Sequence, residues 1–114
     1  MTINALAPLV PTWFTPEGQS TDAPTRFRVR PLSGAEYGDV SDHVSVQGER
    51  TYIANAGRER CLQHALIGWE NFVDASGPLE FNAVNLARIP YLTRMALVAH
   101  IMEISSLSGE QVKN

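Results

Sequence analysis

The stretch of sequence that decides the fold lies at residues 25–36 and reads TRFRVRPLSGAE. In its first half, two apolar side chains alternate with arginines, which is the two-residue period of a strand with one buried face. In its second half, Ser33 stands three residues before Glu36, which is the spacing of a capping box at the start of a helix. The stretch therefore predicts a strand that leads directly into a short helix over about 34–43.

The segment before this stretch is rich in proline. Four of the seven prolines lie within the first 24 residues, and proline interrupts helices because it fixes φ and lacks an N–H donor. Residues 12–15 (TWFT) favour a strand, and residues 16–24 read as a polar loop. We therefore expect an antiparallel β-hairpin, and we divide the chain into an extended proline-rich arm with the first strand at 1–24 and an α+β domain at 25–114, a single domain overall.

The segment after the stretch is mainly helical. Apolar residues recur every three or four positions over 56–74, which predicts an amphipathic helix. Residues 44–55 read as irregular or weakly extended, and residues 79–81 as a short strand or an extended link. Asn82 is expected to cap a short helical turn, and Pro90 to begin a last helix that ends near residue 107. The expected fold class is α+β, with a small N-terminal antiparallel β-hairpin packed on two main α-helices and one or two short helices.

The last helix carries two apolar stripes, although a small domain usually needs one for its core. We expect one stripe to join a core that consists of Phe27, Val29, Leu62, Leu66, Trp69, Val73, Leu92, Met95, Ala99 and Met102. The second stripe is then free to bind a protein partner, with two aromatic residues of the preceding helix as anchors. This candidate protein-binding surface consists of Leu97, Ile101, Ile104, Leu107, Trp69 and Phe72. The alternative is a central helix that is covered on both sides.

Composition excludes several functions. The chain has 114 residues with 9 basic and 12 acidic side chains, so its net charge is −3 and offers no basic excess to neutralise a phosphate backbone. The longest apolar stretch, residues 95–102, is far shorter than the roughly 20 residues that a membrane span needs. A lone cysteine and the lack of a recognisable signal peptide favour a soluble, intracellular protein. We expect neither a nucleic acid nor a membrane as a partner.

Residues that could support catalysis are sparse. The chain has no GxGxxG, P-loop, GxSxG or HExxH motif. Cys61 and His64 stand three residues apart, as do His100 and Glu103, and either pair could supply two ligands to a metal. Two such residues recur often by chance, and Cys61 belongs to the apolar face of its helix. We therefore expect no catalytic residue, no metal site and no cofactor.

The order of these parts resembles a known family. An aromatic-Pro-Glu strand end is followed by a strand that runs into a helix cap, a helix that ends in Gly-Trp, an Asp-x-x-Gly-Pro turn, an extended Leu-x-Phe, and a mostly apolar last helix. The residues concerned are WFTPE (13–17), FRVRPLS (27–33), GWENFVDASGPLEFN (68–82) and the final VKN (112–114). This pattern resembles the small tail assembly chaperones of long-tailed, lambda-like bacteriophages, the G-type family.

The resemblance implies a non-enzymatic role in virus assembly. Members of this family bind the long, helical tape measure protein, keep it soluble and recruit tail tube subunits. They act in the host cytoplasm and are not retained in the mature virion, and a homo-oligomer is compatible with this role. Three alternatives remain open: a head–tail joining or tail-completion protein that stays in the virion, a small metal-dependent enzyme, and an intracellular adaptor domain.

Overall fold

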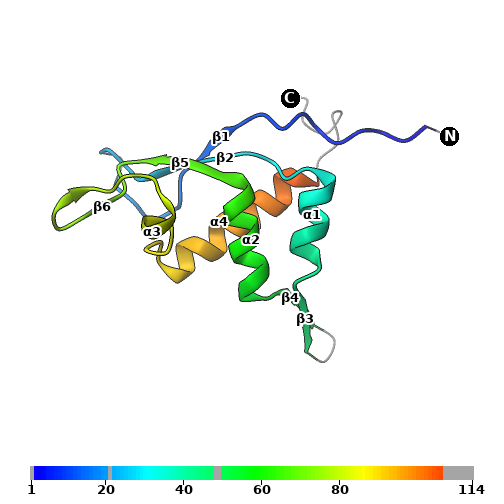
Figure 1. Ribbon diagram of the computed structural model, residues 1–114. Coiled ribbons are helices and arrows are strands. Elements are labelled where there is room, and N and C mark those ends of the chain that lie inside the picture. Colours follow the sequence, from blue (N-terminus) through cyan, green and yellow to red (C-terminus); the bar gives the residue numbers. More distant parts are fainter. Residues whose placement is uncertain (1, 21, 48–49, 107–114) are drawn as a thin grey trace.

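The computed structural model describes residues 2–20, 22–47 and 50–106, with residues 44–47 and 50–52 described by their backbone alone. In chain order, the elements are β1 (Thr12–Phe14), β2 (Arg26–Val29), α1 (Gly34–Ser41), β3 (Val44–Gln47), β4 (Arg50–Ile53), α2 (Asn55–Ala65), β5 (Leu66–Glu70), β6 (Val73–Asp74), β7 (Gly77–Pro78), α3 (Ala83–Leu86) and α4 (Tyr91–Ser105). Figure 1 shows the sheet of β1, β2 and β5 lying across one end of the helices. The α+β fold class is confirmed.

The central sheet contains the predicted hairpin and one strand that was not predicted. β1 pairs antiparallel with β2, with Phe14 opposite Phe27. On its other side β2 pairs antiparallel with β5, with Phe27 opposite Trp69. Residues 79–81 lie outside this sheet and form no strand, so of the two expected alternatives only the extended link remains.

The helix predicted over 56–74 ends much earlier than expected. α2 stops at Ala65, and the next five residues form β5. The apolar residues from Leu66 to Phe72 fit a helical spacing, but Ile67, Trp69 and Phe72 are of the branched and aromatic types that favour strands. Pairing with β2 gives the backbone N–H and C=O groups of β5 the hydrogen bonds that a helix would otherwise provide. The contact between β5 and β2 therefore decides the conformation of this segment.

The capping box is present at the start of α1. The Ser33 hydroxyl accepts a hydrogen bond from the Glu36 N–H (3.1 Å), and the Glu36 carboxylate accepts one from the Ser33 N–H (2.9 Å). Asn82 caps α3 in the same way, through a 2.8 Å bond from the Asn85 N–H. β3 and β4 pair antiparallel, where the sequence predicted irregular or weakly extended structure, so the extended alternative is the one observed.

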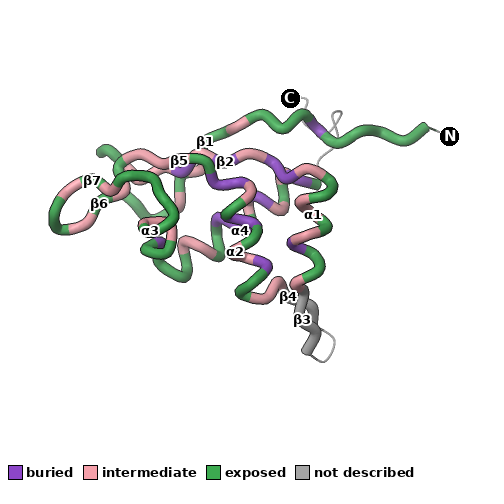
Figure 2. Tube along the Cα trace, viewed as in Figure 1, coloured by how far each residue is buried: buried purple, intermediate pink, exposed green. Residues whose placement is uncertain are grey.

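The core lies where β2, α2 and α4 meet, and α1 packs against the other side of α2 (Figures 1 and 2). Within the described residues, no helix has the length and apolar character that crossing a membrane requires. The buried side chains of the core cluster are Phe27, Val29, Leu32, Val40, Cys61, Leu62, Ala65, Leu66, Ile89, Leu97, Val98 and Ile101.

α4 places its two apolar stripes opposite to the expected arrangement. Leu97 and Ile101, which were predicted to be free, are 0% exposed. Leu92 and Met95, which were predicted to be core, are 77% and 42% exposed, and Ala99 is exposed too. The stripe of Leu97 and Ile101 is buried because it faces α2 and the core cluster. On the other stripe, Leu92, Met95 and Ala99 are exposed, and Met102 packs partly against the core cluster. Among the other expected core residues, Val73 is exposed, while Trp69 and Met102 are half-buried.

The described residues before β1 form an extended arm. Figure 1 shows residues before β1 running away from the sheet beyond α1. Ile3 is 94% exposed, and Leu6, Leu9 and Val10 are exposed as well, whereas Ala7 is buried. The arm therefore contributes little apolar burial to the fold.

Candidate functional site

The predicted protein-binding residues of the last helix do not form a free surface. Leu97 and Ile101 are fully buried, and Ile104 is half-buried against the core cluster. Leu107 lies outside the described residues. Any partner that contacted Leu97 or Ile101 would have to displace α2, so this stripe supports the fold.

The two predicted aromatic anchors also take part in the fold. Trp69 and Phe72 contact one another edge to face, with ring centroids 4.8 Å apart, and both pack against Phe27. The Trp69 indole N–H donates a 2.9 Å hydrogen bond to the carbonyl of Leu79. The stretch 68–82, on which the family resemblance depends, therefore forms β5 and a β6–β7 hairpin tied to it by this indole.

The turn of that hairpin explains the Asp-x-x-Gly-Pro pattern. The Asp74 carboxylate accepts a 2.8 Å hydrogen bond from the Ser76 N–H and forms a 2.8 Å ion pair with Arg88. Gly77 has a φ of +121°, a conformation that residues with a Cβ rarely adopt. These residues have a structural role in the turn.

The cysteine is chemically protected. Cys61 is fully buried, and desolvation raises the pKa of its thiol to about 12. Within the described residues no histidine hydrogen-bonds to the thiol, and no group of three histidine, cysteine or acidic side chains could hold a metal ion. The arrangement offers neither an activated nucleophile nor a metal centre in the described part of the chain.

His64, the other half of the first candidate pair, joins α2 to α1. Its Nε2 lies 2.9 Å from the Asp39 carboxylate, and its Nδ1 lies 3.3 Å from the Glu36 carboxylate. Glu36 also accepts two hydrogen bonds from the Arg30 guanidinium, at 2.7 and 2.8 Å. These ionisable side chains connect two helices and the end of β2.

The arginines of β2 are engaged within the molecule. Arg26 forms an ion pair with Glu70 on β5, and Arg30 pairs with Glu36. The guanidinium groups of Arg26 and Arg28 lie 4.6 and 5.2 Å from the centroid of the Trp13 ring. Each of these groups thus has an intramolecular contact, which gives the cluster a structural explanation.

A different surface is left uncovered on α4. We call it the outer face, and it consists of Leu92, Met95, Ala96, Ala99 and Met102. All but Met102, which is half-buried, are exposed, and all are apolar. The two alanines lie near its middle and the larger side chains lie around them, so the outer face is a shallow apolar track along the helix.

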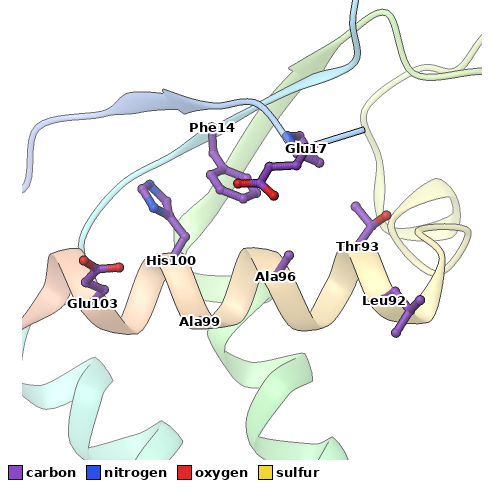
Figure 3. A pocket seen from close by; sticks show the side chains of 9 residues that line it. Phe14, Glu17, Leu92, Thr93, Ala96, Ala99, His100 and Glu103 are labelled. Carbon is purple, nitrogen blue, oxygen red and sulfur yellow. The ribbon is translucent and has the colours of Figure 1, made fainter. Parts of the chain in front are cut away.

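A groove runs beside this track. It encloses about 510 Å³ between α4 and the segment from Phe14 to Glu17. Figure 3 shows Phe14 and Glu17 reaching toward Ala96 and His100 from the opposite wall. A second, smaller groove of about 220 Å³ lies on the other side of the track and is lined by Ile53, Arg58, Met95, Val98, Ala99 and Met102. Ala99 lines both grooves, so the two meet across the outer face.

His100 holds the wall of the larger groove in place. Its ring stacks on Phe14 with centroids 4.6 Å apart, and its Nε2 is buried with no hydrogen-bond partner within the described structure. Burial lowers the pKa of His100, and the nearby Glu103 carboxylate opposes this shift in part. At neutral pH the imidazole is therefore uncharged and packs as a largely apolar ring.

Sequence reasoning missed the groove because its two walls are about 80 positions apart along the chain. Phe14 and Glu17 come from β1 and the loop after it, whereas His100 and Glu103 come from α4. The periodicity of α4 did indicate a second apolar stripe, but it could not tell which stripe the rest of the chain would cover.

Comparison of the chain with family models, with curated proteins and with solved structures found no match in any of the three.

Proposed function

We propose that this protein is a non-enzymatic assembly chaperone that binds a helical client along the outer face of α4. The client we propose is the tape measure protein of a long-tailed bacteriophage, which the chaperone keeps soluble while tail tube subunits are recruited. The observation that carries the proposal is the apolar outer face, which the described chain leaves uncovered along a 15-residue helix.

The outer face has the dimensions and chemistry of a helix-binding surface. α4 is about 22 Å long at a rise of roughly 1.5 Å per residue, which corresponds to four turns of a client helix. Amphipathic helices dock by laying an apolar stripe into a groove of this kind. Full burial of one Leu or Met side chain contributes about 1.5–3 kcal/mol, so Leu92 and Met95 alone could stabilise a complex measurably.

The small residues of the outer face support close approach of a second helix. Ala96 and Ala99 present only methyl groups, so the backbone of a client can lie near that of α4. Met95 and Met102 flank them, and the flexible thioether side chain adapts to apolar partners of different shapes. Such a surface suits a client that offers many similar helical segments.

The proposed place of action is the host cytoplasm during assembly, with release before the virion matures. The order of sequence patterns described above supports this assignment, and so does the structural role of the ionisable groups around Cys61 and His64. No catalytic step is part of the proposal.

Co-expression with a fragment of the tape measure protein tests the proposal. The fragment would be taken from the long, helix-rich reading frame expected beside the gene. We expect the wild-type protein to keep the fragment soluble and to co-purify with it. Ala99→Arg should abolish both effects, because a charged side chain would occupy the point at which the two grooves meet.

The matched control is Ala75→Arg, which makes the same substitution at an exposed position in the β6–β7 turn. It should behave as the wild type does. A fragment that stays equally insoluble with the wild-type protein would contradict the proposed function. Unchanged solubilisation by a folded Ala99→Arg variant would show that the client binds elsewhere.

A further inference from the structure

We propose that the larger groove selects helices with lysine or arginine along one edge of their apolar stripe. This inference rests on the proposed function and narrows the client to a basic amphipathic helix. It is carried by two carboxylates, Glu17 and Glu103, which line the groove together with its apolar floor.

Neither carboxylate has a cation to pair with in the described structure. Glu17 and Glu103 are exposed and take part in no ion pair among the described residues. Five other acidic side chains do have such partners: Glu36, Asp39, Glu59, Glu70 and Asp74. Figure 3 shows Glu17 beside Phe14 on the wall opposite α4, and Glu103 on α4 itself beyond His100.

The end of α4 reinforces the negative potential at Glu103. The last turn of a helix carries a partial negative charge from its unpaired carbonyl groups, which cations usually offset. α4 has no basic residue in its last turn, and Glu103 adds a further negative charge there. A cation supplied by a partner would therefore lower the electrostatic energy at this end of the groove.

Other ionisable side chains near α4 determine which edge of a bound helix should carry the lysines or arginines. His100 lies between the two carboxylates but is uncharged at neutral pH, because burial lowers its pKa. Arg58 lines the smaller groove on the opposite side, where it donates a 2.6 Å hydrogen bond to the Ile53 carbonyl and contacts the Tyr91 ring. The basic edge of the client should therefore face β1 and its following loop, and not α2.

The positions of Glu17 and Glu103 beside α4 determine the spacing expected between the basic side chains of a bound helix. Glu17 and Glu103 line the groove together with Ala96, which lies on α4 seven residues before Glu103. Seven residues span about 10 Å along a helix, or two turns. A helix that lies along α4 would meet both carboxylates with lysines or arginines about seven positions apart.

Two synthetic helical peptides of 18 residues test the inference. Both carry the same leucine and alanine stripe, and one has lysines seven positions apart along its edge where the other has glutamates. Binding of each dye-labelled peptide would be measured by fluorescence anisotropy at low and high salt. We expect the lysine peptide to bind about tenfold more tightly at low salt, because its two cations pair with the carboxylates, which repel the glutamates of the other peptide. The difference should shrink as salt screens the charges.

The double variant Glu17→Gln and Glu103→Gln should bind both peptides with nearly equal affinity. The control Glu80→Gln removes one negative charge from an exposed position outside the groove and should preserve the preference. Equal binding of both peptides by the wild type would overturn the inference, as would binding of neither, or a loss of preference in Glu80→Gln.

These outcomes are separable from those of the proposed function. A protein that keeps the tape measure fragment soluble but shows no preference between the peptides would retain its proposed function and lose the inferred charge selection. A protein that fails to solubilise the fragment but prefers the lysine peptide would have a basic helical partner other than the tape measure protein.

Discussion

Cys61 shows how burial limits the chemistry of a single side chain. It lies on the inner side of α2 with no exposed surface, and the pKa of its thiol is raised to about 12. The reactive form is the thiolate, which is therefore almost absent at neutral pH. We expect a thiol reagent such as DTNB to leave the native protein unmodified and to label one thiol per chain in denaturant. Rapid stoichiometric labelling of the native state would restore the possibility of a cysteine nucleophile.

Glu36 couples three parts of the fold through one carboxylate. Hydrogen bonds from Arg30, more than any other interaction, lower the pKa of Glu36 to about 2. Because this folded-state pKa lies below that of the unfolded chain, the stabilising effect is complete above about pH 4.5 and disappears as the pH falls toward 2. The pair should therefore make the protein sensitive to acid.

The variant Glu36→Gln should lose about 1–2 kcal/mol at pH 7, because Gln keeps the capping box but not the charge-assisted bonds. Urea denaturation at pH 7 and at pH 3 would measure the free energy of unfolding, with Glu80→Gln as the exposed control. The difference in free energy of unfolding between the wild type and Glu36→Gln should be smaller at pH 3 than at pH 7. A gap that is constant with pH would mean that the Arg30–Glu36 pair contributes little.

At the scale of elements, the prediction for α4 is reversed. The apolar stripe that was expected to be free is buried, and the stripe that was expected in the core is mostly exposed. Leu97 is completely buried and Leu92 is largely exposed, although both are leucines on the same helix. Leu97→Ala should destabilise the protein by about 2–5 kcal/mol, since it creates a cavity in the core. Leu92→Ala should change stability by no more than about 0.5 kcal/mol. The two variants serve as each other's control in thermal or urea unfolding. Equal losses of stability would contradict the placement of Leu97 in the core and of Leu92 on the surface.

The helices and strands also show how much of the secondary structure can be predicted from local sequence pattern. The capping box at Ser33 and the cap at Asn82 are both present where the sequence predicted them. The prediction that residues 66–74 continue the helix is wrong, because their apolar spacing is compatible with both a helix and a strand. The conformation of residues 66–70 depends on β2, which lies about 40 residues earlier in the chain. No window of neighbouring residues contains that information.

At the scale of the whole molecule, the described residues of the arm before β1 contribute little apolar burial to the fold. Its larger apolar side chains are exposed, and only Ala7 is buried among the described residues of the arm. Deleting residues 2–10 should therefore change the free energy of unfolding by less than about 1 kcal/mol. Thermal unfolding of the full chain and the deletion variant would measure this difference. A loss of 3 kcal/mol or more would show that the arm belongs to the core.

Three features that depend on residues close together in the sequence were predicted correctly. The strand before Ser33, the helix after it and the cap at Asn82 follow from side chains within a few positions of one another, whose energies hardly depend on the rest of the fold. The end of α2, the buried stripe of α4 and the groove between Phe14 and His100 depend on contacts across 40 to 90 residues. Packing chose between two nearly equivalent apolar stripes, and this choice placed the candidate site on the stripe that local pattern had assigned to the core.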